Sequence, residues 1–262
     1  RLLVLSHVAS TPGAVAEWLT LRGFGKSGMT ALANLGGEAE ARHVGVAAGW
    51  SDTVADFNTL AIECVAGPDA VWHPRTAGLP DDAFEHDGKM TKREIRAVAL
   101  AKLRPHAGAL LWDIGAGCGS IAVEWLRAAS GTKAVALEPR ADRRAMAARN
   151  AVHLGVPQLD IREAAAPDGL SELPRPDAIF VGGGISDETL SAAIRSLPAA
   201  GRLVAHAVTL ESEAILLAHH ARFGGELIRL SVARAEPVGG LHGWRPAMPV
   251  TQWAFDNSGV TG

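Results

Sequence analysis

Three alternating glycines, at positions 115, 117 and 119, separate an apolar run from a helical pattern and constrain the fold more than any other feature of the chain. The apolar run, 110–114, reads as a buried strand that carries Asp113 near its end. Glycine lets the backbone turn tightly and lets a ligand approach with no Cβ in the way. A second strand, 133–137, ends in Glu138, 25 residues after Asp113. A glycine loop after one strand and a carboxylate at the end of the next are how a doubly wound sheet holds a nucleoside.

Strands and helices alternate strictly from residue 89 onwards. We predict strands that end at 113 and 138, strands at 159–163, 177–181 and 201–208, and helices at 92–103, from 120, at 141–154, from 186 and at 210–223. Such alternation indicates a mostly parallel sheet with helices on both faces. Two longer strands, 226–237 and 249–255, follow as an antiparallel pair, where a simple dinucleotide-binding fold continues with helices. The predicted fold class is α/β, with a Rossmann-like sheet and a terminal β-β pair.

The first quarter of the chain has a different pattern. Residues 1 to about 66 predict the order β-α-β-β, with strands at 2–5, 29–35 and 60–65 and a helix over 11–24. Residues 67–88 are rich in Pro, Gly and Asp, which is a linker composition. We therefore expect a first domain over 1–75, a linker over 76–88 and a second domain over 89–262. The chain starts inside a strand with no initiator Met, so we expect a fragment of a longer protein.

Composition argues against several classes of protein. The net charge of −3 argues against a broad basic surface for nucleic acid. Cys64 and Cys118 form no Cys-x-x-Cys pair, so neither a disulfide scaffold nor a metal site is indicated. No run of about 18 apolar residues suggests a membrane span, and the N-terminus shows no secretory signal. The cytoplasm is the expected compartment.

The glycine loop leaves two cofactors open. A dinucleotide fingerprint wants Gly-x-Gly-x-x-Gly, and Ser120 partly meets the last position, so a nicotinamide cofactor stays possible. Asp113 favours an adenosyl thioether instead, because a carboxylate there attracts an ammonium group and repels a pyrophosphate. Glu138 suits both ribose hydroxyls. The chain also has no Tyr for the Tyr-Lys pair of an oxidoreductase.

Several motifs resemble one enzyme family. They are Lys89–Arg96 (KMTKREIR), Asp113–Gly119 (DIGAGCG), Glu163–Pro167 (EAAAP), Pro176–Gly184 (PDAIFVGGG), Ala233-Arg234 and Gly243–Trp253 (GWRPAMPVTQW). On these residues the chain resembles class I S-adenosylmethionine-dependent methyltransferases, and within them the decarboxylating precorrin methyltransferases of cobalamin biosynthesis. Residues 1–75 resemble the C-terminal half of a tetrapyrrole methylase domain.

The resemblance implies an activity and its partners. The family methylates a precorrin macrocycle with S-adenosyl-L-methionine, at carbon 15 by the C-terminal domain and at carbon 5 by the N-terminal domain, and it removes the carboxyl of the ring-C acetate. It implies a tetrapyrrole substrate and a homo-oligomer, a tetramer in relatives. From the composition we expect no nucleic-acid or membrane partner. The alternatives are a class I methyltransferase acting on another substrate and a nicotinamide-dependent oxidoreductase.

The resemblance also implies site residues. The cofactor set, with Asp113 added from the chemistry above, is Thr91, Asp113, Gly115, Ala116, Gly117, Cys118, Gly119, Glu138 and Ala166. The substrate set is Lys92, Gly183, Gly184, Arg234 and Arg245, and the catalytic candidates are His206 and Arg234. Three structural explanations compete with these roles. Thr91 and Glu94 have the spacing of a capping box. His206, near the end of a sheet strand, also fits a hydrogen-bonded histidine of the core, and the cations at 89, 92, 93 and 96 suggest a solvated helix face.

Overall fold

The computed structural model describes residues 1–257. The chain divides into two compact units, Arg1–His73 and a second unit that begins at Pro74. Each unit has its own sheet and its own hydrophobic core. Within the described residues, no helix is long and apolar enough to cross a membrane.

The first unit is an antiparallel sheet with one helix. Its elements are β1 (Leu2–Leu5), α1 (Thr11–Leu21), β2 (Gly28–Ala33), β3 (Ala41–Val46) and β4 (Asn58–Glu63), and the strands lie in the order β1-β4-β2-β3. Alternate residues of β2 and β4 are buried and pack with α1. The sequence did not predict β3, an edge strand on which every residue is exposed or only half-buried.

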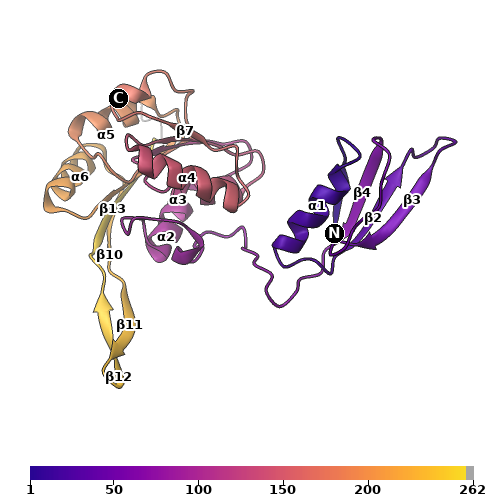
Figure 1. Cartoon of the computed structure of the whole chain (residues 1–262). Coiled ribbons are helices and arrows are strands. Elements are labelled where there is room, and N and C mark those ends of the chain that lie inside the picture. Colours follow the sequence, from indigo (N-terminus) through magenta and orange to yellow (C-terminus); the bar gives the residue numbers. More distant parts are fainter. Residues whose placement is uncertain (258–262) are drawn as a thin grey trace. The chain divides into compact units, whose positions relative to one another are not determined.

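The second unit contains a seven-stranded sheet in the order β10-β13-β9-β8-β5-β6-β7. Figure 1 labels its two edge strands, β10 and β7, and β13 next to β10. The strands are β5 (Leu110–Ile114), β6 (Lys133–Leu137), β7 (Asp160–Arg162), β8 (Ala178–Val181), β9 (Arg202–Ala207), β10 (Glu226–Leu230) and β13 (Val250–Asp256). The five strands from β5 to β9 pair in parallel, and β13 pairs antiparallel with both β9 and β10. The predicted parallel sheet with a terminal antiparallel pair is confirmed.

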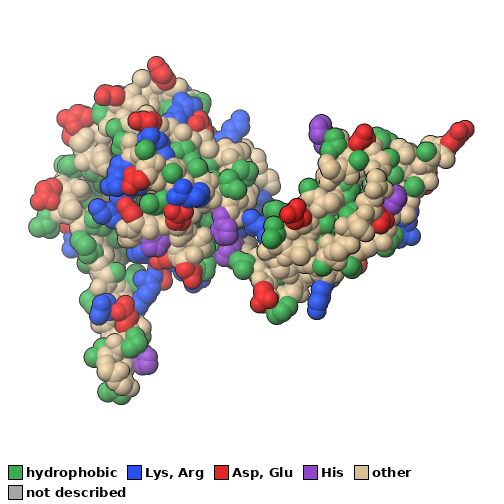
Figure 2. Space-filling model, viewed as in Figure 1, with side chains coloured by type: hydrophobic (Ala, Val, Ile, Leu, Met, Phe, Trp, Pro, Cys, Tyr) green, Lys and Arg blue, Asp and Glu red, His purple; other side chains and the backbone are tan. Residues whose placement is uncertain are grey.

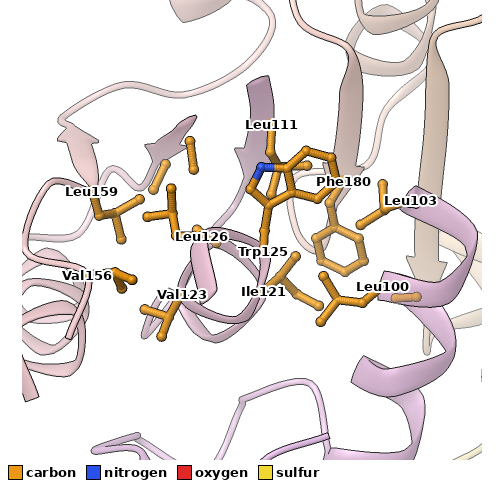
Figure 3. Packing of buried hydrophobic residues seen from close by; sticks show 14 of the residues in the cluster. Leu100, Leu103, Leu111, Ile121, Val123, Trp125, Leu126, Val156, Leu159 and Phe180 are labelled. Carbon is orange, nitrogen blue, oxygen red and sulfur yellow. The ribbon is translucent and has the colours of Figure 1, made fainter. Parts of the chain in front are cut away.

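Helices cover both faces of this sheet. They are α2 (Arg93–Leu103), α3 (Ser120–Ala128), α4 (Ala141–His153), α5 (Asp187–Ser196) and α6 (Leu210–Phe223). Alternate residues of β5 point to opposite faces, as the pleat of a strand requires. Leu111 packs with α2, α3 and α4, where Trp125 and Phe180 fill the core (Figure 3), and Trp112 packs with α5 and α6. The sheet is therefore buried on both sides, as expected of parallel strands.

Two segments differ from the sequence predictions. Residues 76–88, predicted as a linker, pack on the second unit: they include a 3-10 turn at Asp81–Ala83, and Leu79 and Phe84 are buried in its core. The predicted strand 226–237 is broken after β10, and its second part forms a hairpin with a strand that the sequence did not predict. The hairpin strands are β11 (Ala233–Val238) and β12 (Leu241–Pro246), and they project away from the body of the second unit (Figure 1).

Candidate active site

The glycine loop between β5 and α3 adopts a backbone that side chains disfavour. Gly115, Gly117 and Gly119 have φ angles of +69°, +58° and +76°. A Cβ on Gly115 would lie 2.8 Å from backbone atoms of Gly183, in the loop after β8. A Cβ on Gly117 would meet no atom of the described residues within 4 Å. Gly115 is thus required by close backbone packing, whereas Gly117 leaves open space beside the loop.

Glu138, at the end of β6, holds the glycine loop. Its side chain is buried, and its Oε2 accepts a hydrogen bond from the Gly117 N–H at 2.9 Å. Its Oε1 accepts from the Arg140 N–H at 3.0 Å. Because each carboxylate oxygen can accept more than one hydrogen bond, Glu138 keeps acceptor capacity for a ligand.

Asp113 is a buried carboxyl of which only one oxygen has a hydrogen-bond partner among the described residues. Its Oδ2 accepts from the Ala122 N–H, in the first turn of α3, at 3.0 Å. Its Oδ1 has no hydrogen-bond partner among the described residues. Burial raises the pKa of Asp113 to about 7, and the nearby charge of Glu138 adds to the shift. A buried acceptor without a partner is costly, and a cationic donor would satisfy it.

These groups surround one cavity, the first cavity, at the carboxyl ends of β5, β6 and β8. Of the predicted cofactor residues, those that line it are Thr91, Asp113, Gly115, Ala116, Gly117, Cys118, Glu138 and Ala166. Gly119 is not among the described lining residues, because it faces Ala147 of α4. Burial raises the pKa of the Cys118 thiol to about 11, so the thiol is protonated and unreactive at neutral pH.

A second cavity adjoins the first. Its walls are mostly apolar and include Met90, Ile95, Val208, Val232, Met248 and Val250. Its cations are Lys89, Lys92 and Arg234, and no carboxylate lines it among residues 1–257. Four residues line both cavities, and we call them the shared wall: Lys89, Met90, Thr91 and Gly182. The first cavity is therefore polar and contains the carboxylates of Asp113 and Glu138, whereas the second cavity is mostly apolar and contains cations.

The predicted substrate residues do not all meet in the second cavity. Lys92 and Arg234 line it, whereas Gly183 and Gly184 line the first cavity. Arg245 lies opposite Arg234 in the β11–β12 hairpin but pairs with Glu236 at 2.9 Å, and it is not among the described lining residues of either cavity.

His206, on β9, lines the second cavity. Its Nε2 lies 2.8 Å from Oε1 of Gln252, and its ring meets Phe180 edge-on with centroids 4.9 Å apart. Burial lowers the pKa of His206 to about 4, although the hydrogen bond to Gln252 opposes the shift. His206 is therefore a neutral imidazole at pH 7. It can accept a proton or form hydrogen bonds, but it does not supply a proton as an imidazolium ion at neutral pH.

The capping box predicted from Thr91 and Glu94 is wrong. Helix α2 begins at Arg93, its N-cap is Lys92, and that N-cap receives no side-chain hydrogen bond from the described residues. The Glu94 carboxylate instead accepts a hydrogen bond from Arg234 at 2.6 Å. Thr91 thus lies two residues before the helix, directly before the N-cap, where it is part of the shared wall.

Sequence reasoning missed the side chains that hold this site together. Arg96, predicted on a solvated face, is fully buried and pairs with Glu124 at 2.6 Å. Asn150 of α4 is also buried: its Oδ1 accepts from the Glu85 N–H, and its Nδ2 donates to Glu85 O and to Cys118 O, all at 2.8–2.9 Å. Asn150 thereby ties the glycine loop to the segment before α2. The lining residues that the sequence analysis did not name as ligand contacts include Asp87, Met90, Leu137, Arg140, Arg143 and Phe180.

Comparison with known proteins gives consistent matches. A family model described as "precorrin methyltransferase domain" matches residues 82–257. A Sinorhizobium protein named precorrin-6Y C(5,15)-methyltransferase [decarboxylating] is 49% identical over 257 residues, which cover 97% of this chain and 62% of that protein. A shorter Pyrobaculum aerophilum protein, named a probable cobalt-precorrin-6B C(15)-methyltransferase (decarboxylating), is 35% identical over 68% of this chain and 95% of its own length.

A solved structure agrees with the sequence matches. The C-terminal domain of precorrin-6Y C5,15-methyltransferase from Rhodobacter capsulatus superposes with a TM-score of 0.67 and 44% identity. The match covers 70% of this chain and all of that domain. The chain spans 62–64% of the length of the longer relatives that it matches over 97% of itself.

Proposed function

The chain belongs to the precorrin methyltransferase family, and from that premise we propose that its second unit methylates a precorrin at carbon 15 with S-adenosylmethionine and removes the ring-C acetate carboxyl as CO2. The short Pyrobaculum relative supports this assignment, since its name carries carbon 15 and the decarboxylation without carbon 5. We further propose that the first unit is part of a tetrapyrrole methylase domain, which would serve carbon 5 in the longer relatives.

The observation that carries the proposal is the pairing of two unlike cavities across one wall. In the first cavity, the unpartnered Oδ1 of Asp113 suits the cofactor's ammonium group, and Glu138 suits its ribose hydroxyls. In the second cavity, apolar walls suit the faces of a macrocycle, and the cations suit its carboxylates. Methyl donor and acceptor would meet beside Met90, Thr91 and Gly182 of the shared wall.

The protein's part in methyl transfer is alignment. The bound sulfonium supplies an electrophilic methyl group, and an electron-rich meso carbon needs no strong base to attack it. Holding two reactants in line replaces a bimolecular encounter with an effectively unimolecular step. The two cavities and the shared wall provide that arrangement, so we assign the rate advantage chiefly to geometry.

For decarboxylation, the residues of the second cavity divide the work. Arg234, Lys89 and Lys92 would hold the carboxylates that stay on the macrocycle. The apolar walls would exclude water from the departing carboxylate. Loss of hydration destabilises the charged carboxylate relative to the transition state, in which its charge spreads into the macrocycle. The conjugated macrocycle would take up the electron pair of the broken C–C bond as CO2 leaves, and a proton from solvent water would then complete the C–H bond on the former acetate carbon. In neutral His206, Nε2 is occupied by Gln252 Oε1, so Nδ1 stays free to accept a hydrogen bond or a proton beside the bound macrocycle.

We propose no nucleic-acid partner, a cytoplasmic location and a homo-oligomer. On the face shown in Figure 2, Lys and Arg side chains are interspersed with Asp and Glu rather than gathered into one basic patch. The β11–β12 hairpin exposes Leu241 and Trp244, each at 77%, together with Val238. Exposed apolar groups on a projecting hairpin favour burial against another subunit, and a tetramer is the form that family resemblance implies.

Activity on a precorrin tests the proposal directly. With methyl-labelled S-adenosylmethionine, the chain should transfer label to the tetrapyrrole and release CO2. Arg234→Ala should raise the KM for the tetrapyrrole at least tenfold and leave the KM for the cofactor within twofold. Arg245→Ala is the matched control, because Arg245 lies opposite on the hairpin and pairs with Glu236. Equal effects of the two changes would remove Arg234 from the acceptor site, and a thermal shift with NAD but none with S-adenosylhomocysteine would favour the oxidoreductase.

A further inference from the structure

Arg96 is a fully buried cation that the proposed reaction does not use. Its side chain on α2 is 0% exposed. Nε donates to Glu124 Oε1 at 2.6 Å, and the guanidinium lies over the ring of Phe84 at 4.8 Å. A buried ion pair contributes little net stability once desolvation is counted, whereas its directed hydrogen bonds fix geometry. The bonds of Arg96 therefore show what it positions.

Two of those bonds go to backbone carbonyls, and one of these carbonyls belongs to a residue that lines both cavities. Nη1 donates to the carbonyl of Thr91 at 2.6 Å, and Nη2 donates to the carbonyl of Leu79. Glu124 extends the grip, because it accepts from the N–H groups of Gly78 and Leu79 at 2.6 and 2.9 Å. The ion pair thus holds the chain at two places on either side of residues 80–90, and Thr91 belongs to the shared wall.

Asp81 connects this grip to the acceptor side. Its carboxylate lies 3.2 Å from Nη1 of Arg96 and 4.0 Å from Nη2 of Arg234. Arg234 lines the second cavity and is also paired with Glu94. One carboxylate is therefore shared between the cation that fixes the wall and a cation that faces the acceptor.

We propose that Arg96 is a positioning residue for the methyl transfer. Together with Glu124 and Asp81 it sets the shared wall, so that cofactor and acceptor affinity both depend on a guanidinium that touches neither ligand. This inference rests on the proposed function. Arg96 acts on the shared wall through its hydrogen bond to the Thr91 carbonyl. Its loss should therefore change ligand affinity, and the protection of the amides of the shared wall from hydrogen exchange, more than a comparable loss of core packing does.

The test replaces the planar fork with a single ammonium. In Arg96→Lys, one ammonium group cannot reach all the acceptors that the guanidinium spans. We expect the Kd for S-adenosylhomocysteine, measured by calorimetry, to rise at least tenfold, and the amides of residues 89–92 to exchange hydrogen faster. Val123→Ala is the control, because Val123 is buried beside Glu124 on α3 and lies outside the described linings of both cavities. It should lower Tm while the Kd stays within twofold.

The outcomes separate the two proposals. If Arg96→Lys binds S-adenosylhomocysteine with unchanged Kd and unchanged exchange at residues 89–92, the positioning role is wrong. If the unmodified chain does not bind S-adenosylhomocysteine, the proposed function fails, while hydrogen exchange still reports on the wall. Should Arg96→Lys not fold, Asp81→Asn serves, since Asp81 is 24% exposed. It should raise threefold the Kd values for S-adenosylhomocysteine and for uroporphyrin, a polycarboxylate tetrapyrrole probe, and unchanged values for both would overturn the inference.

Discussion

Replacing Asp113 with Asn should make the chain more stable and a poorer binder. The pKa of Asp113 is raised by burial to about 7 in the fold, from the ordinary value of 3.8. Between these values the folded chain holds a proton that the unfolded chain has released, so stability falls as pH rises from about 4 to 7. At about 1.4 kcal/mol for each pKa unit, the full loss above pH 7 is about 4 kcal/mol. We expect about half of it, ~2 kcal/mol, to return in Asp113→Asn at pH 8, because the Asn amide is itself buried without full satisfaction.

Binding should show the opposite sign. If the cofactor's ammonium group meets ionised Asp113, binding near neutral pH releases the proton that the ligand-free carboxyl holds. A site with pKa about 7 is about 90% protonated at pH 6 and about 10% protonated at pH 8. The Kd for S-adenosylhomocysteine should therefore be about tenfold higher at pH 6 than at pH 8, and Asp113→Asn should abolish most of that dependence.

Calorimetry in buffers of different ionisation enthalpy measures the protons released, and thermal melts at pH 5 and pH 8 measure stability. The matched control is Asp177→Asn, since Asp177 accepts from the Leu110 N–H at the other end of β5, away from the first cavity. It should leave binding and its pH dependence unchanged. The reasoning is refuted if Asp113→Asn binds as tightly as the original chain, or if it melts at a lower temperature than the original chain at pH 8.

Three further results are expected. Glu138→Gln should raise the Kd for S-adenosylhomocysteine about tenfold, because an amide has one accepting oxygen, whereas the Glu138 carboxylate accepts from the Gly117 N–H and is proposed to accept from the ribose hydroxyls as well; an unchanged Kd would place the ribose elsewhere. His206, with a pKa of about 4, should show no imidazole titration by NMR between pH 5.5 and 8, and an inflection near 6.5 would mean that it is solvated. Asn150→Ala should lower the unfolding free energy by about 1–3 kcal/mol and raise the Kd for S-adenosylhomocysteine several-fold, because the carbonyl of Cys118 in the glycine loop loses its donor. A change in stability alone, or in Kd alone, would contradict the view that Asn150 supports both the fold and the site.

The elements of the second unit could be predicted because their apolar patterns are local. Strand β5, the glycine loop and α3 follow from alternating glycines between an apolar run and a helical pattern, and the structure has β5 at Leu110–Ile114 and α3 from Ser120. Most of the predicted cofactor residues line one cavity because the carboxyl ends of parallel strands share one edge of the sheet. The first cavity is thus largely readable from sequence.

The hairpin escaped prediction although the sequence contains its signal. Residues 226–237 look like one strand, but Gly239 and Gly240 separate two β runs, which is the pattern of a two-residue hairpin turn. Gly239 has a φ of +59°, as such a turn requires. The break after β10 depends instead on tertiary packing, because only β10 finds a partner in β13.

The buried polar clamps were harder to foresee. Arg96 shares a helical face with Ala99, Leu100 and Leu103, all buried, so the spacing i, i+3, i+4, i+7 could have placed it inside. Its partner Glu124 is 28 residues away on another helix, and no local pattern pairs them. The same limit explains Glu94, which lies in the first turn of α2 but whose carboxylate pairs with Arg234 on the hairpin and does not cap the helix.

The central claim is that the pocket of Asp113, the glycine loop and Glu138 holds the methyl donor. A crystal structure of the chain grown with S-adenosylhomocysteine tests it most directly. We expect the amino group of the ligand about 3 Å from Oδ1 of Asp113, with the ribose hydroxyls on Glu138. Ligand density away from residues 113–119 and 138 would contradict the account.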